Sequence, residues 1–300
     1  MTANADAELL SESLASTGIL VAACDLPVEA SADFIRARLP DGRVGWLAVS
    51  PAGRMRLATE GRLLRVLARR TDLPVPRLAA VSANGDLQVR TLLEGVAGAD
   101  ALTAIICDPA RAARIGTELG LVLAQLHTRV IAADVANWLP HSPEWPESGE
   151  WIGRRLPEVT DDASLRADCM ALIARVAAMK VDPADRVLVH GDLGVHNIVA
   201  DASSLRVTGV FDWEAACWAD RHIDFRYFVT AGSSQPLLDA AIAAYEPVTG
   251  RKISRARVRE YNAAIAVTYL AFRVGVSAAQ RWCGRTLAQD LAWTREALAA

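Results

Sequence analysis

The chain has 300 residues, of which 52% are hydrophobic, so it carries enough apolar material for the core of one or two globular domains. A formal net charge of -3 and a pI near 6.0 argue against a nucleic-acid partner, because such partners select strongly basic surfaces. The five cysteines are scattered and form no Cys-x-x-Cys pair, which argues against a disulfide scaffold and against a structural zinc site.

Neither a targeting segment nor a membrane segment is expected. The first eight residues are acidic and contain neither a basic leader nor an apolar export segment. The longest apolar run, 263–279, includes Arg273 and is too short to span a bilayer. We therefore expect a cytoplasmic protein without a membrane partner, present as a monomer or a homodimer.

The first third of the chain predicts a small antiparallel sheet of five strands, beginning with the apolar run at 18–23, and one inserted helix. Turns at Asp41-Gly42 and Asn84-Gly85 each separate two apolar segments and predict two hairpins. The paired segments are 32–39 with 44–50, and 77–81 with 87–93. Between the hairpins, residues 56–70 place leucines at helical spacing with arginines between them, which is typical of an amphipathic helix.

The rest of the chain predicts a mostly helical region. A helix is expected from Asp108 and Pro109 to His127, which we interpret as a structural histidine of the core. Residues 130–160 are irregular and rich in Pro and Trp, so they are a candidate substrate lid; the alternative is a loop that its tryptophans pin to the core. The other expected helices span 162–179, 235–246, 254–276 and 278–298.

Residues 187–199 contain the pattern from which the predicted chemistry starts. An apolar strand leads into His190-Gly-Asp192, and Asn197 follows after four residues, which is the catalytic-loop spacing of kinases. In that arrangement an Asp accepts the proton of an attacking hydroxyl, and an Asn amide oxygen holds Mg²⁺. The same residue types are common in turns after strands, so this half of the pattern is not sufficient.

A second strand that ends in a carboxylate decides between these interpretations. Residues 205–211 alternate between polar and apolar and then become fully apolar, and they are followed by Asp212. In kinases the matching strand ends in the Asp that chelates Mg²⁺. With a turn at 201–204, the two strands would bring Asp192, Asn197 and Asp212 to one rim, which predicts phosphoryl transfer.

Residues 185–230 resemble the aminoglycoside phosphotransferase family, which includes macrolide and viomycin-type antibiotic kinases. The resemblance is carried by His190-Gly-Asp-Leu-x-x-x-Asn197, by Gly-Val-Phe-Asp-Trp-Glu at 209–214 and by Asp-Arg-His-Ile-Asp at 220–224. It implies an α+β, bilobal protein-kinase-like fold. Residues 1–94 would form the nucleotide-binding lobe, and residues 95–300 the catalytic and substrate-binding lobe.

The resemblance also implies catalytic roles for single residues. Asp192 would accept the proton of the attacking hydroxyl, and Asn197 and Asp212 would hold Mg²⁺. His190 and Asp224 would be structural residues beside this site, with Asp224 bracing the catalytic loop. Substrate contact is the alternative for Asp224.

In the nucleotide site, the resemblance implies a hinge at residues 91–95. Backbone groups near Thr91 and Leu93 would meet the purine of ATP or GTP. The alternative is that Glu94-Gly95 is only a turn that ends the strand.

One departure from the family pattern concerns the nucleotide phosphates. The family carries a Lys or Arg in its third strand to hold the phosphates, paired with a Glu on the following helix. Here Glu60 is present, but Ala48 or Val49 occupies the basic position. Arg54 or Arg56, just after the strand, could hold the phosphates instead; the alternative is that both are solvated surface residues.

The expected reaction is transfer of the γ-phosphate of ATP or GTP to a hydroxyl of a small molecule. Candidate substrate contacts are Trp213, Glu214 and Asp220, and for each carboxylate the alternative is a solvated surface group. Carboxylates would suit an aminoglycoside or a cationic cyclic-peptide antibiotic, whereas an apolar cleft lined by tryptophans would suit a macrolide. The resemblance ranks the cationic antibiotic first and the macrolide second.

Two further hypotheses remain open. One is a metabolite kinase for an amino alcohol or a sugar. The other is a pseudokinase-like binding protein, which the missing strand cation suggests and the intact Asp192, Asn197 and Asp212 argue against. Nucleotide turnover that disappears in Asp192→Ala would exclude the binding protein.

Overall fold

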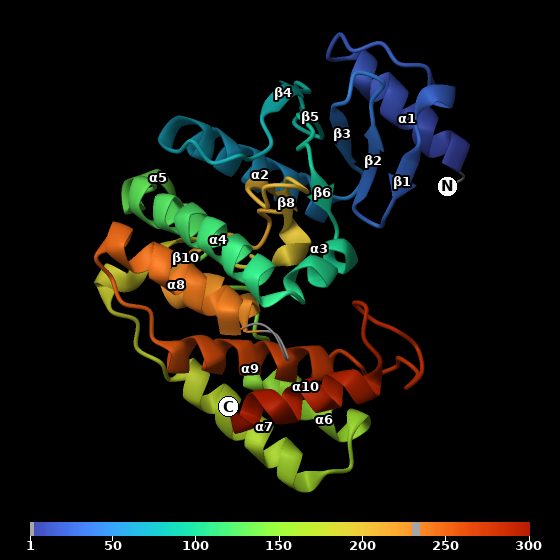
Figure 1. Cartoon of the computed structure of the whole chain (residues 1–300). Coiled ribbons are helices and arrows are strands. Elements are labelled where there is room, and N and C mark those ends of the chain that lie inside the picture. The colour runs from blue at the N-terminus through green and yellow to red at the C-terminus, as the bar shows by residue number, and fades with distance from the viewer. Residues whose placement is uncertain (1–2, 230–234) are drawn as a thin grey trace. The chain divides into compact units, whose positions relative to one another are not determined.

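The computed structural model describes residues 3–229 and 235–300 (Figure 1). Its internal contacts divide the chain into two units. The smaller unit consists of Met1–Leu102 and Val195–Glu214, and the larger unit consists of Thr103–Gly194 and Ala215–Ala300. The smaller unit thus takes a second segment from far along the chain.

The smaller unit contains a five-stranded antiparallel sheet with the strand order β1-β2-β3-β5-β4. Its strands are β1 (Val28–Ala30), β2 (Phe34–Arg38), β3 (Val44–Ala48), β4 (Leu78–Val81) and β5 (Leu87–Arg90). Helix α1 (Ala3–Ala15) lies beside the sheet in Figure 1, and its Leu10 packs with Leu47 and Val89 in one buried cluster. The predicted antiparallel sheet with its inserted helix is confirmed, but its first strand is β1 and not the apolar run at 18–23, which lies outside the strands.

Helix α2 (Pro51–Arg70) approaches the opposite face of this sheet, where Gln88 donates to the carbonyl of Leu57 at 2.6 Å. The helix begins at Pro51 rather than at the predicted residue 56. Ser50 accepts a hydrogen bond from the amide of Gly53 at 2.9 Å, and a proline at the first helical position costs no hydrogen bond. The helix start is therefore determined by its cap and not by its first leucine.

A second, three-stranded sheet joins distant parts of the smaller unit. Its strands are β6 (Val96–Ala97), β8 (Ile198–Ala200) and β9 (Val207–Val210), in the order β6-β8-β9. In the turn between β8 and β9, the carboxylate of Asp201 accepts hydrogen bonds from the amides of Ser203 and Ser204 at 3.1 and 2.7 Å. This is the hairpin predicted around residues 201–204. Helix α3 (Ala99–Ile106) follows β6.

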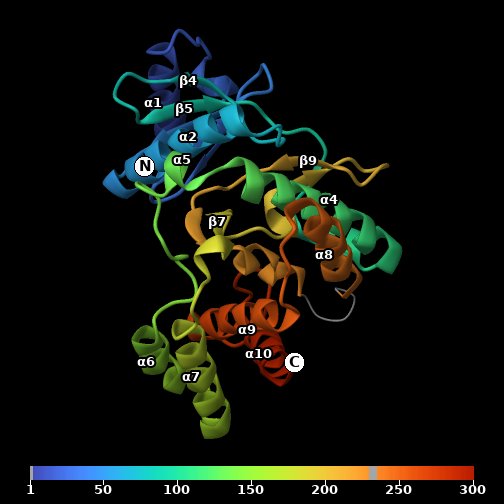
Figure 2. The same ribbon diagram turned by 90° about the vertical axis from the view of Figure 1, so that its left-hand side faces the viewer.

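In the larger unit, helices α4 (Pro109–Arg129) and α8 (Gln235–Thr249) run side by side in both views (Figures 1 and 2). They approach closely because α4 carries Gly116 and Gly120. A Cβ at these positions would lie 2.2 Å from the carbonyl oxygen of Leu237 and 2.3 Å from that of Ala241. The antiparallel pair β7 (Arg186–Val189) and β10 (Cys217–Asp220) belongs to the same unit.

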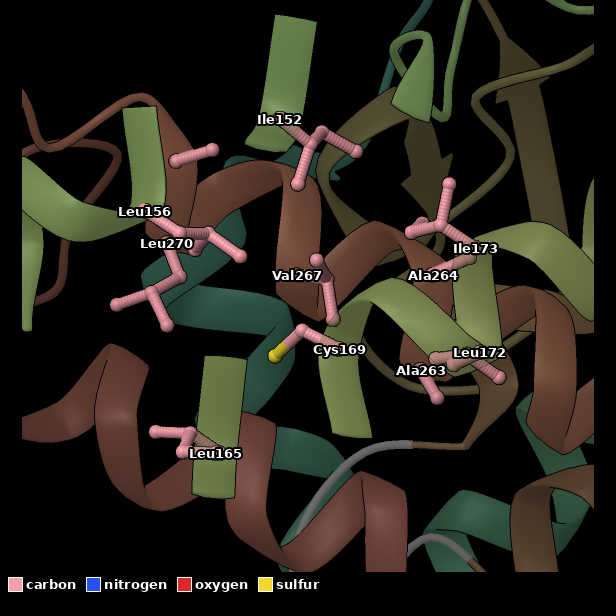
Figure 3. Close-up of a cluster of buried hydrophobic side chains, with 11 residues drawn as sticks. Ile152, Leu156, Leu165, Cys169, Leu172, Ile173, Ala263, Ala264, Val267 and Leu270 are labelled. Atoms are coloured by element: carbon pink, nitrogen blue, oxygen red, sulfur yellow. The ribbon is translucent and has the colours of Figure 1, made fainter. Parts of the chain in front are cut away.

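A second group of helices in the larger unit shares one apolar core (Figure 3). The helices are α6 (Gly149–Val159), α7 (Ala163–Ala177), α9 (Arg255–Ala271) and α10 (Leu287–Ala299). Ile152, Cys169 and Val267 are fully buried within this core. The remaining helix is the short α5 (Ala132–Val135).

Other predicted elements also differ from the structure. Part of the segment 130–160, expected to be irregular, forms α6, because Ser148 caps the helix by accepting from the amide of Trp151 at 3.2 Å. The last helix begins at Leu287 instead of residue 278. In the preceding loop, Arg273 is held by the fully buried carboxylate of Asp290 at 2.6 Å.

Within residues 3–229 and 235–300, helices with the length and apolarity needed to cross a membrane are absent.

Candidate active site

The loop that carries Asp192 follows strand β7. Gly191 has a φ of +82°, and a Cβ there would lie 2.2 Å from the carbonyl oxygen of Ala215, so only glycine fits. The carboxylate of Asp224 accepts hydrogen bonds from the amides of His190 and Gly191 at 3.0 and 2.9 Å. Asp224 is 1% exposed, so the loop is held from beneath by a buried negative charge.

A chain of hydrogen bonds connects Asp224 to the surrounding helices. Arg221 donates to the Tyr245 hydroxyl at 2.7 Å, and this hydroxyl lies 2.9 Å from Nδ1 of His127. Nε2 of His127 lies 3.0 Å from Asp224. Burial lowers the pKa of His127, although the adjacent Asp224 charge acts in the opposite direction. A neutral His127 that donates from Nε2 and accepts at Nδ1 satisfies every group in this chain.

Arg226 holds the same loop from another direction. Its guanidinium donates to the carbonyl of Gly191 and, at 3.0 Å, to the carbonyl of Trp145.

Asp192 itself is partly exposed, and its amide donates to Nδ1 of His190 at 3.3 Å. Burial raises the pKa of the Tyr227 phenol, and the charge of Asp192 and a hydrogen bond with it act in the same direction. Asp192 therefore has a phenol beside it that stays protonated.

Asn197 and Asp212 are brought together in the smaller unit, at the open end of the β8–β9 hairpin. The amide of Phe211 donates to the carbonyl of Asn197 at 3.1 Å, next to the pair Ile198 and Val210. Asn197 is 4% exposed, whereas Asp212 is exposed. Asp212 has a φ of +65°, a conformation that costs a non-glycine residue about 1–3 kcal/mol. Such strain persists only where neighbouring contacts hold the backbone.

Glu60 on α2 contributes one of these contacts. Its carboxylate accepts a hydrogen bond from the amide of Trp213 at 3.3 Å and a second one from Arg90 on β5 at 2.8 Å. The Trp213 side chain is 1% exposed and donates to the carbonyl of Val210 at 3.2 Å. The Trp213 ring, which was expected to contact the substrate, thus packs in the core of the smaller unit next to Asp212.

Asp220 was also expected to contact the substrate, but the structure buries it. It is 1% exposed and accepts hydrogen bonds from Nδ1 of His222 at 2.6 Å and from the hydroxyl of Tyr261 at 2.8 Å. Arg257 completes an ion pair with it at 2.5 Å. Burial raises the pKa of Asp220, but the bond to His222 and the charge of Arg257 outweigh burial and lower it. Asp220 thus connects β10 to α9 inside the larger unit.

The residues expected to bind nucleotide are all in the smaller unit. Thr91 is exposed, and its amide donates to the carbonyl of Arg77 at 2.9 Å, so a contact with the purine at this residue would involve its carbonyl group. Leu93 is partly buried against Gly209. Arg54 and the expected substrate contact Glu214 are both exposed.

The smaller unit therefore gathers Glu60, Asn197 and Asp212, and the larger unit gathers His190, Asp192 and Asp224. The model of the phosphotransferase enzyme family matches residues 30–261, which include all of these positions. The chain belongs to this phosphotransferase family.

Solved structures of related enzymes have the same fold. The macrolide 2'-phosphotransferase MphH from Brachybacterium faecium, as the apoenzyme, is 25% identical, with a TM-score of 0.66 over 98% of this chain and 97% of that one. A macrolide 2'-phosphotransferase type I is 22% identical, with a TM-score of 0.64 over 98% and 96%. The GDP and kanamycin complex of APH(2")-IIIa is 16% identical, with a TM-score of 0.63 over 91% of each chain.

These similarities confirm the α+β, kinase-like fold expected from the sequence. Comparison with curated proteins finds no significant match. As a member of the phosphotransferase family, the chain is an enzyme.

Asn197 and Asp212 of this phosphotransferase fit the requirements of Mg²⁺. Both present oxygen donors, and Mg²⁺ in phosphoryl-transfer enzymes is bound through one or two carboxylates together with the phosphates of the substrate. Over residues 3–229 and 235–300, three or more His, Cys, Asp or Glu side chains nowhere gather as a metal-binding group. Two oxygen donors next to a bound nucleotide are sufficient for Mg²⁺, whereas they are too few for a structural zinc site.

The larger unit of the phosphotransferase contains an aromatic cluster that was not expected from the sequence. Its members are all partly exposed: Trp145, Trp151, Tyr269, Phe272, Trp282 and Trp293. Phe272 stacks on Trp145 and on Trp282, with ring centroids 4.9 and 5.4 Å apart. Tyr269 contacts three of the other rings. Only Trp145 and Trp151 belong to the segment that the sequence singled out.

The aromatic cluster is connected to the loop that carries Asp192. The same Arg226 guanidinium donates to the carbonyls of Trp145 and Gly191. Burial raises the pKa of Tyr269 to about 12, and the charges of Cys283 and Asp192 add to this effect. The aromatic cluster and the loop at Asp192 thus share the contact with Arg226.

Proposed function

We propose that this phosphotransferase transfers the γ-phosphate of ATP or GTP to a hydroxyl group of a small-molecule antibiotic. The observation that carries the proposal is the loop at Asp192, whose backbone is fixed by the buried Asp224 and Arg226 while the Asp192 side chain stays partly exposed. Catalytic carboxylates need this combination of a rigid backbone and an accessible tip.

Asp192 orients the acceptor hydroxyl and takes its proton as the oxygen attacks the γ-phosphorus. The Tyr227 phenol stays protonated beside it and holds the carboxylate by a hydrogen bond. Asn197 and Asp212 would hold Mg²⁺, which would supply positive charge to offset the negative charge of the nucleotide phosphates. The exposed Glu214 remains a candidate contact for a cationic group of the acceptor.

The aromatic cluster favours an acceptor with a large apolar face, such as a macrolide, over a polycationic aminoglycoside. Stacked, half-buried rings offer apolar contact, and the charged side chains that lie over them, Arg155 and Arg285, are both cationic. Of the two carboxylates expected to contact a cationic acceptor, Glu214 and Asp220, the second is buried in internal contacts. The order of acceptors expected from the sequence is therefore reversed in this proposal, with the macrolide first.

A panel of acceptors tests both parts of the proposal. The purified protein is incubated with Mg²⁺, with ATP or GTP, and with macrolides, aminoglycosides, cyclic-peptide antibiotics and simple alcohols, and the products are examined by mass spectrometry. We expect a mass gain of one phosphoryl group on a macrolide. Asp192→Asn should lower kcat by roughly 10²–10⁴-fold, the usual contribution of a general base.

Asp168→Asn, on the exposed surface of α7, is the matched control and should leave kcat unchanged. Phosphorylation of aminoglycosides alone would overturn the acceptor class while leaving phosphotransfer intact. If none of the acceptors were phosphorylated although Mg²⁺ and nucleotide bound, the binding-protein hypothesis would replace the proposal.

A further inference from the structure

Strand β3 lacks the basic residue that the phosphotransferase family uses beside the nucleotide phosphates. The structure places another basic side chain, that of Arg90, on the adjacent strand β5. Residues directly opposite in an antiparallel pair share one face of the sheet, and so do residues two apart. Arg90 on β5 is opposite Val44 of β3, so it lies on the same face as Trp46 and as Ala48, one of the two positions at which the basic residue was expected.

The guanidinium of Arg90 is fixed on three sides. Its Nη1 donates to Oε2 of Glu60 at 2.8 Å, and its Nη2 donates to Oε1 of Gln88 at 2.8 Å. Its Cζ lies 5.6 Å from the centroid of the Trp46 ring. The Arg90 and Glu60 side chains are 6% and 13% exposed, so their attraction is only weakly screened by solvent.

Glu60 extends this contact to the expected metal ligands. Its second oxygen, Oε1, accepts the hydrogen bond from the amide of Trp213, the residue that directly follows Asp212. Asp212 has a φ of +65°, so its backbone leaves this conformation unless neighbouring groups are held. The amide of Phe211, on the other side of Asp212, is bound to the carbonyl of Asn197. Glu60 thus holds one of the two backbone groups that flank Asp212.

We propose that Arg90 replaces the missing cation of strand β3 as the partner of Glu60 and, through Glu60, positions Asp212 for Mg²⁺ and nucleotide. The inference rests on the proposed function. It assigns Arg90 as a positioning residue: without its charge, the Glu60 carboxylate would turn toward water and release the amide of Trp213. The Asp212 carboxylate would then lose its fixed direction.

The experiment measures nucleotide binding as well as turnover. Isothermal titration calorimetry with Mg²⁺ and a non-hydrolysable ATP or GTP analogue, in the absence of acceptor, is compared for the wild-type protein, Arg90→Met and Arg90→Lys. We expect Arg90→Met to weaken binding by about 10- to 100-fold and to raise the Mg²⁺ concentration for half-maximal turnover similarly, as is usual when groups that orient metal ligands are removed. Arg90→Lys should retain part of the affinity, and the KM of the acceptor should not change.

Arg36→Met is the matched control. Arg36 also lies over the Trp46 ring, at 5.3 Å, and also pairs with a glutamate, but its partner is the exposed Glu29. We expect it to leave nucleotide binding unchanged. If Arg90→Met does not fold, Glu60→Gln replaces it, because this change removes the charge that Arg90 holds, so the side chain can turn away from the amide of Trp213.

The possible results are distinguishable. Unchanged nucleotide affinity and Mg²⁺ dependence in Arg90→Met or Glu60→Gln, with only a lower melting temperature, would overturn the inference and leave a merely structural ion pair. Equal losses in Arg36→Met and Arg90→Met would also overturn it. A wild-type protein that binds Mg²⁺ and nucleotide but phosphorylates none of the acceptors would contradict the proposed function alone.

Discussion

Asp224 uses both carboxylate oxygens to fix the loop at Asp192, since one accepts from Gly191 and the other from His190 and His127. The family resemblance implied this bracing role, but not the path through His127 and Tyr245 that supports Asp224 from helices α4 and α8. A buried charge of this kind is tolerated because every oxygen is matched by a donor.

The hydrogen bonds that connect Arg221, Tyr245, His127 and Asp224 also predict how the stability of the protein depends on pH. Burial lowers the pKa of His127 below its ordinary value of 6.5. The unfolded protein therefore binds a proton where the folded protein leaves His127 neutral, and the free energy of unfolding falls as the pH drops below about 6.5. This one group can contribute at most about 1.4 kcal/mol per pH unit.

Urea unfolding of the wild-type protein and of His127→Gln, measured between about pH 8 and about pH 5, checks this prediction. The wild type should be the more stable protein at high pH, and the difference should narrow as the pH falls. A difference that widens in acid would show that His127 is stabilised in its charged form.

Asp220 and Trp213 illustrate why a residue's type does not determine its role. Both follow the metal-binding motif closely in the chain, and both were expected at the substrate. Their burial depends on partners such as Tyr261 and Glu60, which lie 41 and 153 residues away from them. Local sequence carries no information on such partners.

Helix packing in the larger unit depends on close backbone approach at α4. Sequence periodicity predicted the apolar stripe of this helix but gave no indication that its glycines face another backbone. Because the neighbouring atoms are carbonyl oxygens of α8, which cannot move as freely as a side-chain end, a methyl group at Gly120 has no space.

Gly120→Ala therefore tests packing against helix propensity. Propensity alone predicts that alanine stabilises a helix by about 1 kcal/mol relative to glycine. The clash with the carbonyl oxygen of Ala241 predicts instead a loss of about 1–3 kcal/mol in the free energy of unfolding. Chemical denaturation of the variant decides between the two.

Gly153→Ala in α6 is the control for this experiment. A Cβ at Gly153 would lie 3.3 Å from Cε of Met170, the flexible end of a side chain that can move away. This variant should be neutral or more stable than the wild type. A stabilised Gly120→Ala would contradict the close packing of α4 on α8.

The aromatic cluster is assembled from parts of the chain that are far apart. Trp145 and Trp151 come from the segment around α6, Tyr269 and Phe272 from α9 and the residues after it, and Trp282 and Trp293 from the C-terminal loop and α10. The loop that carries Trp282 is fixed by the buried pair of Arg273 and Asp290. The cluster therefore depends on the fold of the larger unit and not on any one motif.

Trp282→Ala tests whether these rings contact the acceptor. Loss of the stacked ring should raise the KM of the acceptor by roughly 5- to 30-fold, equivalent to about 1–2 kcal/mol, without changing the KM of the nucleotide. Trp138→Ala is the control, because Trp138 lies outside the cluster and donates to the carbonyl of Asp134 at 2.9 Å. Equal effects of both variants on the acceptor, or an effect of Trp282→Ala on the nucleotide alone, would contradict the assignment.

Local patterns in the chain were sufficient for the three hairpins and β7, for most helices, and for the spacing of His190, Asp192, Asn197 and Asp212, because periodicity and turn chemistry act over a few residues. Three features emerged only from the folded chain: the pairing of Arg90 with Glu60, the burial of Asp220 and Trp213, and the aromatic cluster. Each depends on which distant segments become neighbours, and that choice is made by packing over the whole core, which no short stretch of sequence encodes.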